Sequence, residues 1–78
     1  MEDLIIIGAS GFGREVAWAV ERQNKVAPTW NLLGFLDDND ELQGKDVNGY
    51  RVLGKTVDVS RYPDSYYVCA VGVCTLKR

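Results

Sequence analysis

The sequence predicts an α/β protein with a Rossmann-like parallel sheet and flanking helices, small and truncated in form. The strongest observation is an uninterrupted apolar run at residues 4–7, which is typical of a parallel strand covered on both faces. Three glycines within residues 8–13 follow this run, and a helical pattern follows the glycines. A second predicted buried strand at residues 31–36 completes a unit of strand, helix and strand, the repeating unit of this class.

The chain length supports one hydrophobic core. A chain of 78 residues buries only about 60% of the surface that it exposes when unfolded. We therefore expect residues 1–78 to form a single Rossmann-like domain. The hydrophobic content of 46% and the charged content of 26% exclude the disordered and membrane classes.

Charge and hydropathy exclude two kinds of partner. The formal net charge is −2 and the Lys and Arg residues are scattered except at the last two positions, so no basic stripe is available for nucleic acid. The first apolar run is too short for a signal peptide or a membrane span. We expect a cytoplasmic protein with no membrane span.

The first helix is predicted over residues 13–24. Phe12, Val16, Ala19 and Val20 recur at helical spacing, which predicts that they form the buried face. Asn24 is the predicted stop of this helix. Trp18 lies off this face, and we expect it to be exposed in the isolated chain or to meet a second molecule; cover by a neighbouring loop of its own chain is the alternative.

The remaining elements follow from turn signals. An acidic turn ends the strand at residues 31–36, and an Asn-Gly turn at residues 48–49 predicts a hairpin with residues 50–53 as its second arm. Thr56 is the predicted cap of a short helix that runs to Tyr62. Residues 66–71 predict a third buried strand, and right-handed crossovers then give the strand order 2-1-3.

The loop between the first strand and the first helix is the predicted phosphate site. Gly8, Gly11 and Gly13 lack a β-carbon, so the backbone can approach a ligand, and the unpaired N–H groups of a helix start attract an anion. Ser10 and Phe12 lie between these glycines. A tight turn that needs small residues for helix packing is the alternative explanation of the same pattern.

Four further residues are candidates for the same site. Asp37 ends the second strand, where a carboxylate can accept hydrogen bonds from a ribose or a base, and Asp38 can share the task; a solvated turn is the alternative. Arg14 places a cation at the positive end of the helix dipole, which a bound phosphate would favour, whereas an exposed Arg14 paired with Glu15 or Glu21 is the alternative. Gly72 lets the third strand approach the ligand or simply ends the strand.

Metal binding and catalysis find little support in the composition. The chain has two cysteines and no histidine, so a zinc site would need ligands from another chain. Histidine is also the commonest general base, and carboxylates or another segment would have to replace it. We predict no metal site.

Four motifs occur in order along the chain: IIGASGFGREV at residues 6–16, GFLDD at 34–38, GYRVLG at 49–54 and AVG at 70–72. Together they resemble the N-terminal domain of bacterial sugar acyltransferases of the sialic acid O-acetyltransferase type. That family includes N-acetyltransferases that act on nucleotide-linked amino sugars. The resemblance runs from Leu4 to the end of the chain and is more specific than the glycines alone.

The resemblance implies a Rossmann-like domain that holds a nucleotide sugar, for which a UDP-linked sugar is the first compound to consider. It also implies that Ser10, Gly11 and Phe12 lie along the nucleotide sugar, that Asp37 and Asp38 recognise the nucleoside, and that Gly72 approaches the ligand. In these relatives a C-terminal left-handed β-helix of hexapeptide repeats forms homotrimers and carries acetyl-CoA and the catalytic histidine. No such repeat occurs here, so we expect acetyl-CoA and a homotrimer only for a full-length protein, and no catalytic residue or bound cofactor in this chain.

Two other functions stay open: a dinucleotide-binding fragment of an oxidoreductase, and a non-catalytic interaction domain. The loop has the spacing G-x-x-G-x-G, whereas the dinucleotide fingerprint is G-x-G-x-x-G. An interaction domain gives no reason for glycines and carboxylates to converge at one edge of a sheet. The sequence therefore predicts the substrate-binding domain of a sugar O- or N-acyltransferase.

Overall fold

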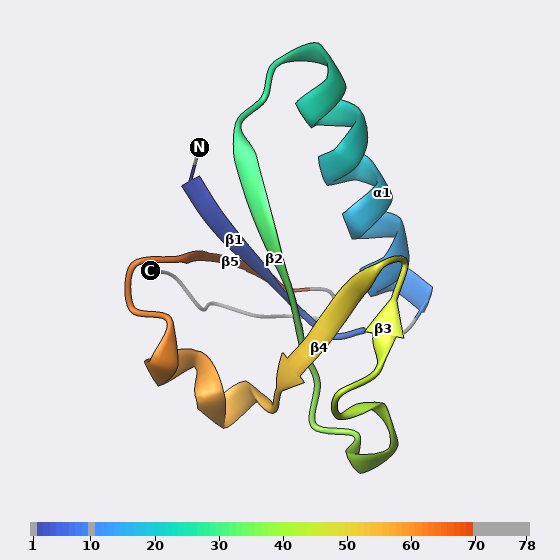
Figure 1. Ribbon diagram of the computed structural model, residues 1–78, viewed down its shortest axis with the longest axis vertical. Coiled ribbons are helices and arrows are strands. Elements are labelled where there is room, and N and C mark those ends of the chain that lie inside the picture. Colours follow the sequence, from blue (N-terminus) through green and yellow to red (C-terminus); the bar gives the residue numbers. More distant parts are fainter. Residues whose placement is uncertain (1, 10, 70–78) are drawn as a thin grey trace.

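The computed structural model describes residues 2–9 and 11–69, which form a sheet with one α-helix and two short 3₁₀ helices (Figure 1). The elements in chain order are β1 (Glu2–Ile7), α1 (Gly11–Val26), β2 (Trp30–Leu36), η1 (Asp40–Leu42), β3 (Asp46–Val47), β4 (Tyr50–Gly54), η2 (Thr56–Arg61) and β5 (Tyr66–Cys69). The predicted α/β class with a Rossmann-like parallel sheet is confirmed.

The five strands lie in the order β3-β4-β2-β1-β5. β1 pairs in parallel with β2 on one side and with β5 on the other, which confirms the predicted order 2-1-3. β3 and β4 form the predicted hairpin. The sequence did not predict that β4 also pairs in parallel with β2 and so extends the main sheet. The Asn-Gly turn identifies a hairpin but carries no information about the strand beside it.

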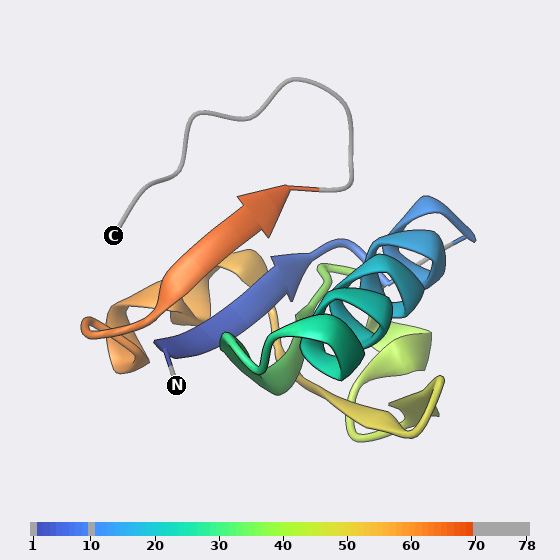
Figure 2. The ribbon, with the colours of Figure 1, turned by 90° about the horizontal axis from the view of Figure 1, so that it is seen from above.

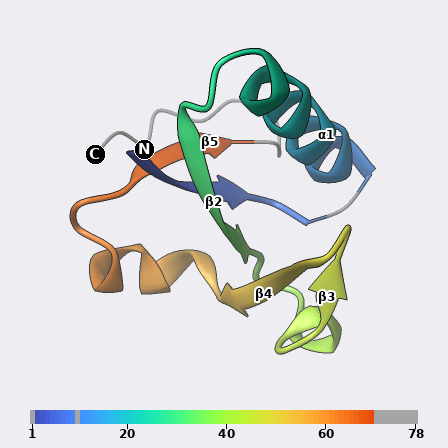
Figure 3. The same cartoon turned by 45° about the horizontal axis from the view of Figure 1, so that its top comes forward.

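The two faces of the sheet are covered by different elements, α1 on one face and η2 on the other (Figures 2 and 3). Alternate strand residues supply the two halves of the core. Ile6 and Phe35 pack with Ala17 of α1, whereas Ile5 and Ile7 pack on the side of η2. Because β1 is covered on both faces, all its side chains from Leu4 onward are buried, as its uninterrupted apolar run predicts.

The buried face of α1 differs from the predicted one. Gly13, Ala17 and Val20 are buried, whereas Ala19 is exposed and Phe12 keeps 60% of its surface exposed. The predicted face was therefore wrong at these two positions. Small residues allow the helix to lie close to the sheet, and apolar spacing alone does not distinguish a close approach from an ordinary one.

The end of α1 also differs from the prediction. The helix continues to Val26, so Asn24 does not stop it. The Asn24 side chain instead accepts hydrogen bonds from the backbone N–H groups of Thr29 and Trp30 and donates one to the Trp30 carbonyl. These bonds fix the short connection that leads from the helix into β2.

A β-bulge interrupts the pairing of β1 with β2, where Leu4 pairs with Leu32 and the next residue, Ile5, pairs with Gly34. The φ of +152° at Gly34 is one that side chains rarely adopt, and a β-carbon there would lie 2.3 Å from the carbonyl oxygen of Arg51. Glycine at this position therefore lets β4 pass close to β2.

Two surface features complete the fold. Trp18 is 48% exposed on the outer side of α1, which confirms the prediction that it is exposed in the isolated chain. Beside α1 on the same face as the helix, an apolar groove of about 330 Å³ lies over β1 and β5, with Leu4, Trp30 and Tyr66 in its walls.

In the described part of the chain, no helix is both long enough and apolar enough to cross a bilayer.

Candidate functional site

The glycine loop leaves β1 at its carboxyl end and leads directly into α1. The N–H group of Gly8 donates to the carbonyl oxygen of Leu36 at 2.8 Å. This bond extends the hydrogen bonding between β1 and β2 one residue beyond the end of β1. Gly8 has a φ of +105°, and this left-handed conformation turns the chain away from the sheet. Ser10 lies outside the described residues. The loop therefore lies at the carboxyl edge of the parallel strands, where ligands of this fold class bind.

A pocket of about 400 Å³ opens between the glycine loop and the β3–β4 hairpin; we call it the loop pocket. Its walls come from three segments, and the lining residues are Ala9, Gly11, Arg14, Leu42, Asp46, Val47 and Asn48. Gly11 is open to this space, because a β-carbon built on it meets no atom within 4 Å. A pocket of this volume is within the range of small-molecule sites.

Arg14 is held at the rim of the loop pocket by Asn48, the first residue of the hairpin turn. The Nε–H of Arg14 donates to Oδ1 of Asn48 at 3.1 Å, and Nδ2 of Asn48 donates to the backbone oxygen of Arg14 at 3.1 Å. Among residues 2–9 and 11–69, Arg14 forms no ion pair, and Glu21 accepts a hydrogen bond from Tyr50. The predicted alternative, in which Arg14 pairs with Glu15 or Glu21, is therefore wrong.

The positive end of α1 is not neutralised by its own helix. The first turn contains no acidic residue, and the side chain of Arg14 adds a cation to the positive end of the helix dipole. Asp46 supplies a carboxylate to the same pocket, and this carboxylate lies 3.6 Å from the guanidinium of Arg51. The electrostatics of the loop side of the pocket thus favour an anion.

Asp37 ties the end of β2 to the glycine loop. Its Oδ2 accepts a hydrogen bond from the N–H of Ala9 at 2.8 Å, and its Oδ1 accepts one from the N–H of Asn39 at 2.9 Å. Asp37 lies beside the glycine loop at the end of a strand, as predicted. It also makes the local turn hydrogen bond that aspartate often makes. Each oxygen keeps a second lone pair, so the carboxylate can still accept from a ligand hydroxyl.

Asp38 is bound by Thr56 rather than left in a free turn. The backbone N–H and the hydroxyl of Thr56 both donate to Oδ1 of Asp38, and these two bonds lower the pKa of the Asp38 carboxyl below its ordinary value of 3.8. The predicted role of Thr56 as a helix cap is wrong. At the start of η2 it is the Asp58 carboxylate that accepts the N–H of Lys55.

A second, smaller pocket of about 220 Å³ lies at the carboxyl ends of β1 and β2, and we call it the strand-end pocket. Its lining residues are Ile7, Gly8, Leu36, Asp37, Asp38 and Thr56. The hydrogen bond from Ala9 to Asp37 joins a residue of the loop pocket to a residue of the strand-end pocket. The glycine loop is therefore flanked by an anion-favouring pocket and by a pocket that carries two carboxylates.

The structure assigns the predicted site residues to different places. Gly8, Gly11, Arg14, Asp37 and Asp38 line one of the two pockets. Two others lie elsewhere: Gly13 is buried, and a β-carbon on it would lie 2.0 Å from the Gly8 carbonyl oxygen, whereas Phe12 projects into solvent at the start of α1. For Gly13 the packing explanation is sufficient. Gly72 lies outside the described residues, as Ser10 does.

The hairpin supplies pocket residues that the sequence analysis missed. Asp46, Val47 and Asn48 follow the glycine loop by more than thirty positions, and the Asn-Gly pair was interpreted only as a turn. The signal that could have found them is the pairing of β4 with β2, because it brings the hairpin turn beside the first turn of α1. Leu42, which packs against the core from η1, had no signal in the sequence.

The comparisons with known proteins agree with this arrangement. The sequence profile of the PglD N-terminal domain matches residues 3–78, nearly the whole chain. The comparison with curated proteins gives no match. The resemblance to the N-terminal domains of acetyltransferases is thus confirmed at the level of the family. With its Rossmann-like sheet and its glycine loop at the carboxyl edge, the chain belongs to the PglD N-terminal domain family.

Proposed function

We propose that this domain binds the substrate of a sugar O- or N-acyltransferase and that the substrate is a nucleotide-linked sugar. The observation that carries the proposal is the unneutralised positive end of α1, with Arg14 and the open Gly11 facing a pocket of about 400 Å³. A diphosphate fits this environment because the helix N–H groups and the guanidinium both favour negative charge. Membership of the PglD N-terminal domain family supports the same substrate class.

The two carboxylates supply the second half of the proposed site. We assign the nucleoside to the strand-end pocket, where Asp37 and Asp38 lie beside the glycine loop. A ribose hydroxyl can donate to the free lone pairs of either carboxylate, as acidic residues at this strand end do in related folds. Uridine is the nucleoside to test first, because the resemblance to sugar acyltransferases implies a nucleotide sugar of this kind.

The acyl transfer itself belongs, in this proposal, to a C-terminal part of the full-length protein. That part would bind acetyl-CoA, supply the catalytic histidine and form the homotrimer, as the resemblance to sialic acid O-acetyltransferase-type enzymes implies. Residues 1–78 would then position the acceptor sugar. No chemical step is assigned to a side chain of this chain.

Calorimetry of the purified chain with uridine diphosphate, pyrophosphate, uridine and nicotinamide adenine dinucleotide tests the proposal. We expect uridine diphosphate to bind more tightly than either of its parts, because both pockets are then filled, and the dinucleotide to give no heat above background. Binding of the dinucleotide without binding of uridine diphosphate would instead favour the oxidoreductase fragment.

The variant Gly11→Val tests the location of the site. A β-carbon at this position meets no atom within 4 Å outside the neighbouring backbone, so the domain should fold, yet the branched side chain would occupy the pocket and abolish nucleotide binding. Ala19→Val is the matched control, because it adds a branched side chain at an exposed position of the same helix. Equal affinities for all three proteins would show that the loop pocket does not hold the nucleotide.

A further inference from the structure

We infer that Asn48 is a positioning residue for the substrate phosphates, acting through Arg14. This inference rests on the proposed function, and it adds a role for the hairpin turn that neither the family nor the glycine motif assigns. The two residues are 34 positions apart in the chain, and the fold brings them together at the rim of the loop pocket.

The contact is reciprocal, which sets it apart from a chance surface pair. Asn48 accepts from the Nε–H of Arg14 and donates to the Arg14 backbone oxygen, both at 3.1 Å. One side chain therefore holds both the guanidinium and the helix turn that carries it. A single exposed arginine would otherwise sample many rotamers, and ordering such a side chain opposes binding.

The geometry leaves the useful part of the guanidinium available. The bond to Asn48 uses Nε, and the two Nη groups of Arg14 hydrogen-bond to no other described residue. Nη groups are the donors that arginine offers to phosphate oxygens in paired fashion. Asn48 thus orients Arg14 toward the pocket without competing for the donors that a diphosphate would use.

The backbone of Asn48 permits a clean test. Asn48 has a φ of +54°, in the left-handed region that glycine also adopts readily, and it is followed by Gly49 in the hairpin turn. Asn48→Gly therefore removes the side chain while the turn can keep its conformation. Asn31→Ala is the matched control, because its Nδ2 donates to Asp3 at 2.9 Å near the start of β1, away from the loop pocket.

The experiment measures the affinities of wild type, Arg14→Ala, Asn48→Gly and the double variant for uridine diphosphate and for uridine. We expect Asn48→Gly to weaken uridine diphosphate roughly three- to tenfold and Arg14→Ala to weaken it at least tenfold, with uridine unchanged in both. Asn48→Gly should cause no further loss in the Arg14→Ala background, since it acts through that residue. Asn31→Ala should bind as wild type does.

Two results would overturn the inference while the proposed function stands. The first is an unchanged affinity of Asn48→Gly for uridine diphosphate when Arg14→Ala weakens binding. The second is an equal loss for uridine and uridine diphosphate, which would indicate a distorted pocket rather than a displaced cation. Absence of uridine diphosphate binding by the wild type would instead overturn the proposed function, and this inference with it.

Discussion

Two glycines of one loop differ in their surroundings. Gly13 is buried under the chain that leaves β1, and a β-carbon there would lie 2.0 Å from the Gly8 carbonyl oxygen. Gly11 faces open space, so nothing in the protein itself requires its lack of a side chain. The motif therefore combines a glycine that packing requires with a glycine that packing does not explain.

Alanine at each of the two positions tests this difference. Gly13→Ala should lower the free energy of unfolding by about 2 kcal/mol or more, because backbone atoms must shift to admit the β-carbon. Gly11→Ala should leave stability unchanged or raise it by up to about 1 kcal/mol, since alanine favours the helix. Urea unfolding followed by circular dichroism measures both. A Gly13→Ala protein as stable as wild type would show that α1 can move away from β1 at little cost.

The sequence identifies the strand-end residues of the site more readily than their partners. Asp37 was predicted from its place at the end of an apolar run, because the carboxyl ends of parallel strands form the ligand edge. Its hydrogen bond to the N–H of Ala9, 28 residues earlier, depends on how two loops meet in space. Asn48 shows the same limit, since the Asn-Gly turn predicts a local shape and not the arginine against which it rests.

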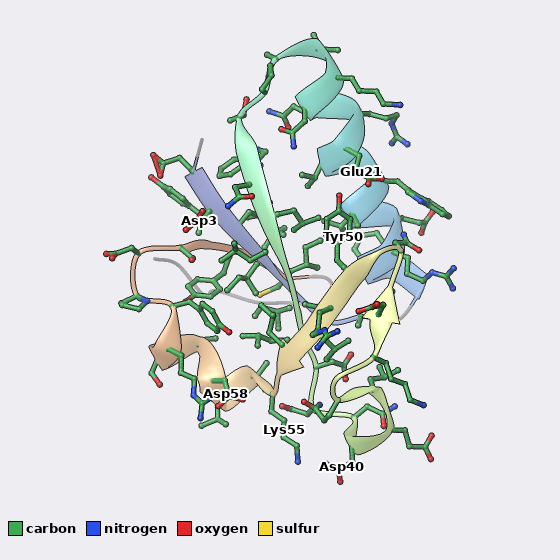
Figure 4. The ribbon with its side chains drawn as sticks, in the orientation of Figure 1. Asp3, Glu21, Asp40, Tyr50, Lys55 and Asp58 are labelled. Atoms are coloured by element: carbon green, nitrogen blue, oxygen red, sulfur yellow. The ribbon has the colours of Figure 1, made fainter. Side chains whose placement is uncertain are left out.

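At the scale of elements, the β3–β4 hairpin is attached to α1 by a second polar contact besides the one at the loop pocket. The hydroxyl of Tyr50 at the start of β4 donates to Oε2 of Glu21 at 2.8 Å, and Figure 4 shows these side chains meeting between strand and helix. The carboxylate that accepts this bond raises the pKa of Tyr50 above its ordinary value of 10.0, with burial and charge adding to the shift. The hairpin is thus fixed to the helix at two points.

Tyr50→Phe should lower the free energy of unfolding by about 1 to 2 kcal/mol at pH 7, because a hydrogen bond to a charged acceptor is lost. Since the folded pKa is raised, the bond contributes fully below pH 10 and is lost as pH rises through the raised pKa. The difference between Tyr50→Phe and wild type, measured by urea unfolding, should therefore shrink at higher pH.

Tyr62→Phe is the control for the Tyr50 prediction. The Tyr62 hydroxyl donates to no described residue, although its ring packs in the core on the side of η2. Its removal should change stability by less than about 0.5 kcal/mol. A similar loss in both variants would mean that the Tyr50 hydroxyl contributes nothing specific through Glu21.

The type of most helices and strands could be predicted from the sequence, whereas their neighbours in the fold could be predicted less well. The apolar run of β1 and the Asn-Gly turn each determine a local conformation through physics that acts within a few residues. The addition of β4 to the edge of β2 depends on the bulge at Gly34 and on burial of Val52, which involve residues far apart in the chain. The buried face of α1 was misjudged at Phe12 and Ala19 for the same reason, because the face that meets the sheet depends on strand residues far away in the chain.

At the scale of the whole molecule, one aromatic side chain occupies the centre of the core. Phe35 is fully buried on β2 and packs with Ile6, Ala17 and Val52, which come from three other elements. A domain this small has a total stability on the order of 5 kcal/mol. Its folding therefore depends on a few such residues to an unusual degree.

Phe35→Ala should cost about 3 to 5 kcal/mol through the cavity that it leaves, enough to leave much of the protein unfolded at 37 °C. Phe12→Ala is the matched control, because Phe12 is 60% exposed and its truncation should change stability by less than about 0.5 kcal/mol. Thermal unfolding by circular dichroism without ligand compares the two. Similar melting temperatures for the two variants would contradict the assignment of Phe35 to the centre of the core.

The pairing of β1 with β5 has a consequence for how the protein is made. β1 leaves the ribosome before the other described strands, while β5, which pairs with it from Leu4 to Ile7, is the last of them. Closing so long a loop is slow, and until residues 66–69 emerge, one edge of the most apolar strand has no neighbour to hydrogen-bond. During synthesis the chain therefore exposes the edge of an apolar strand, which is an aggregation hazard, until β5 has been made.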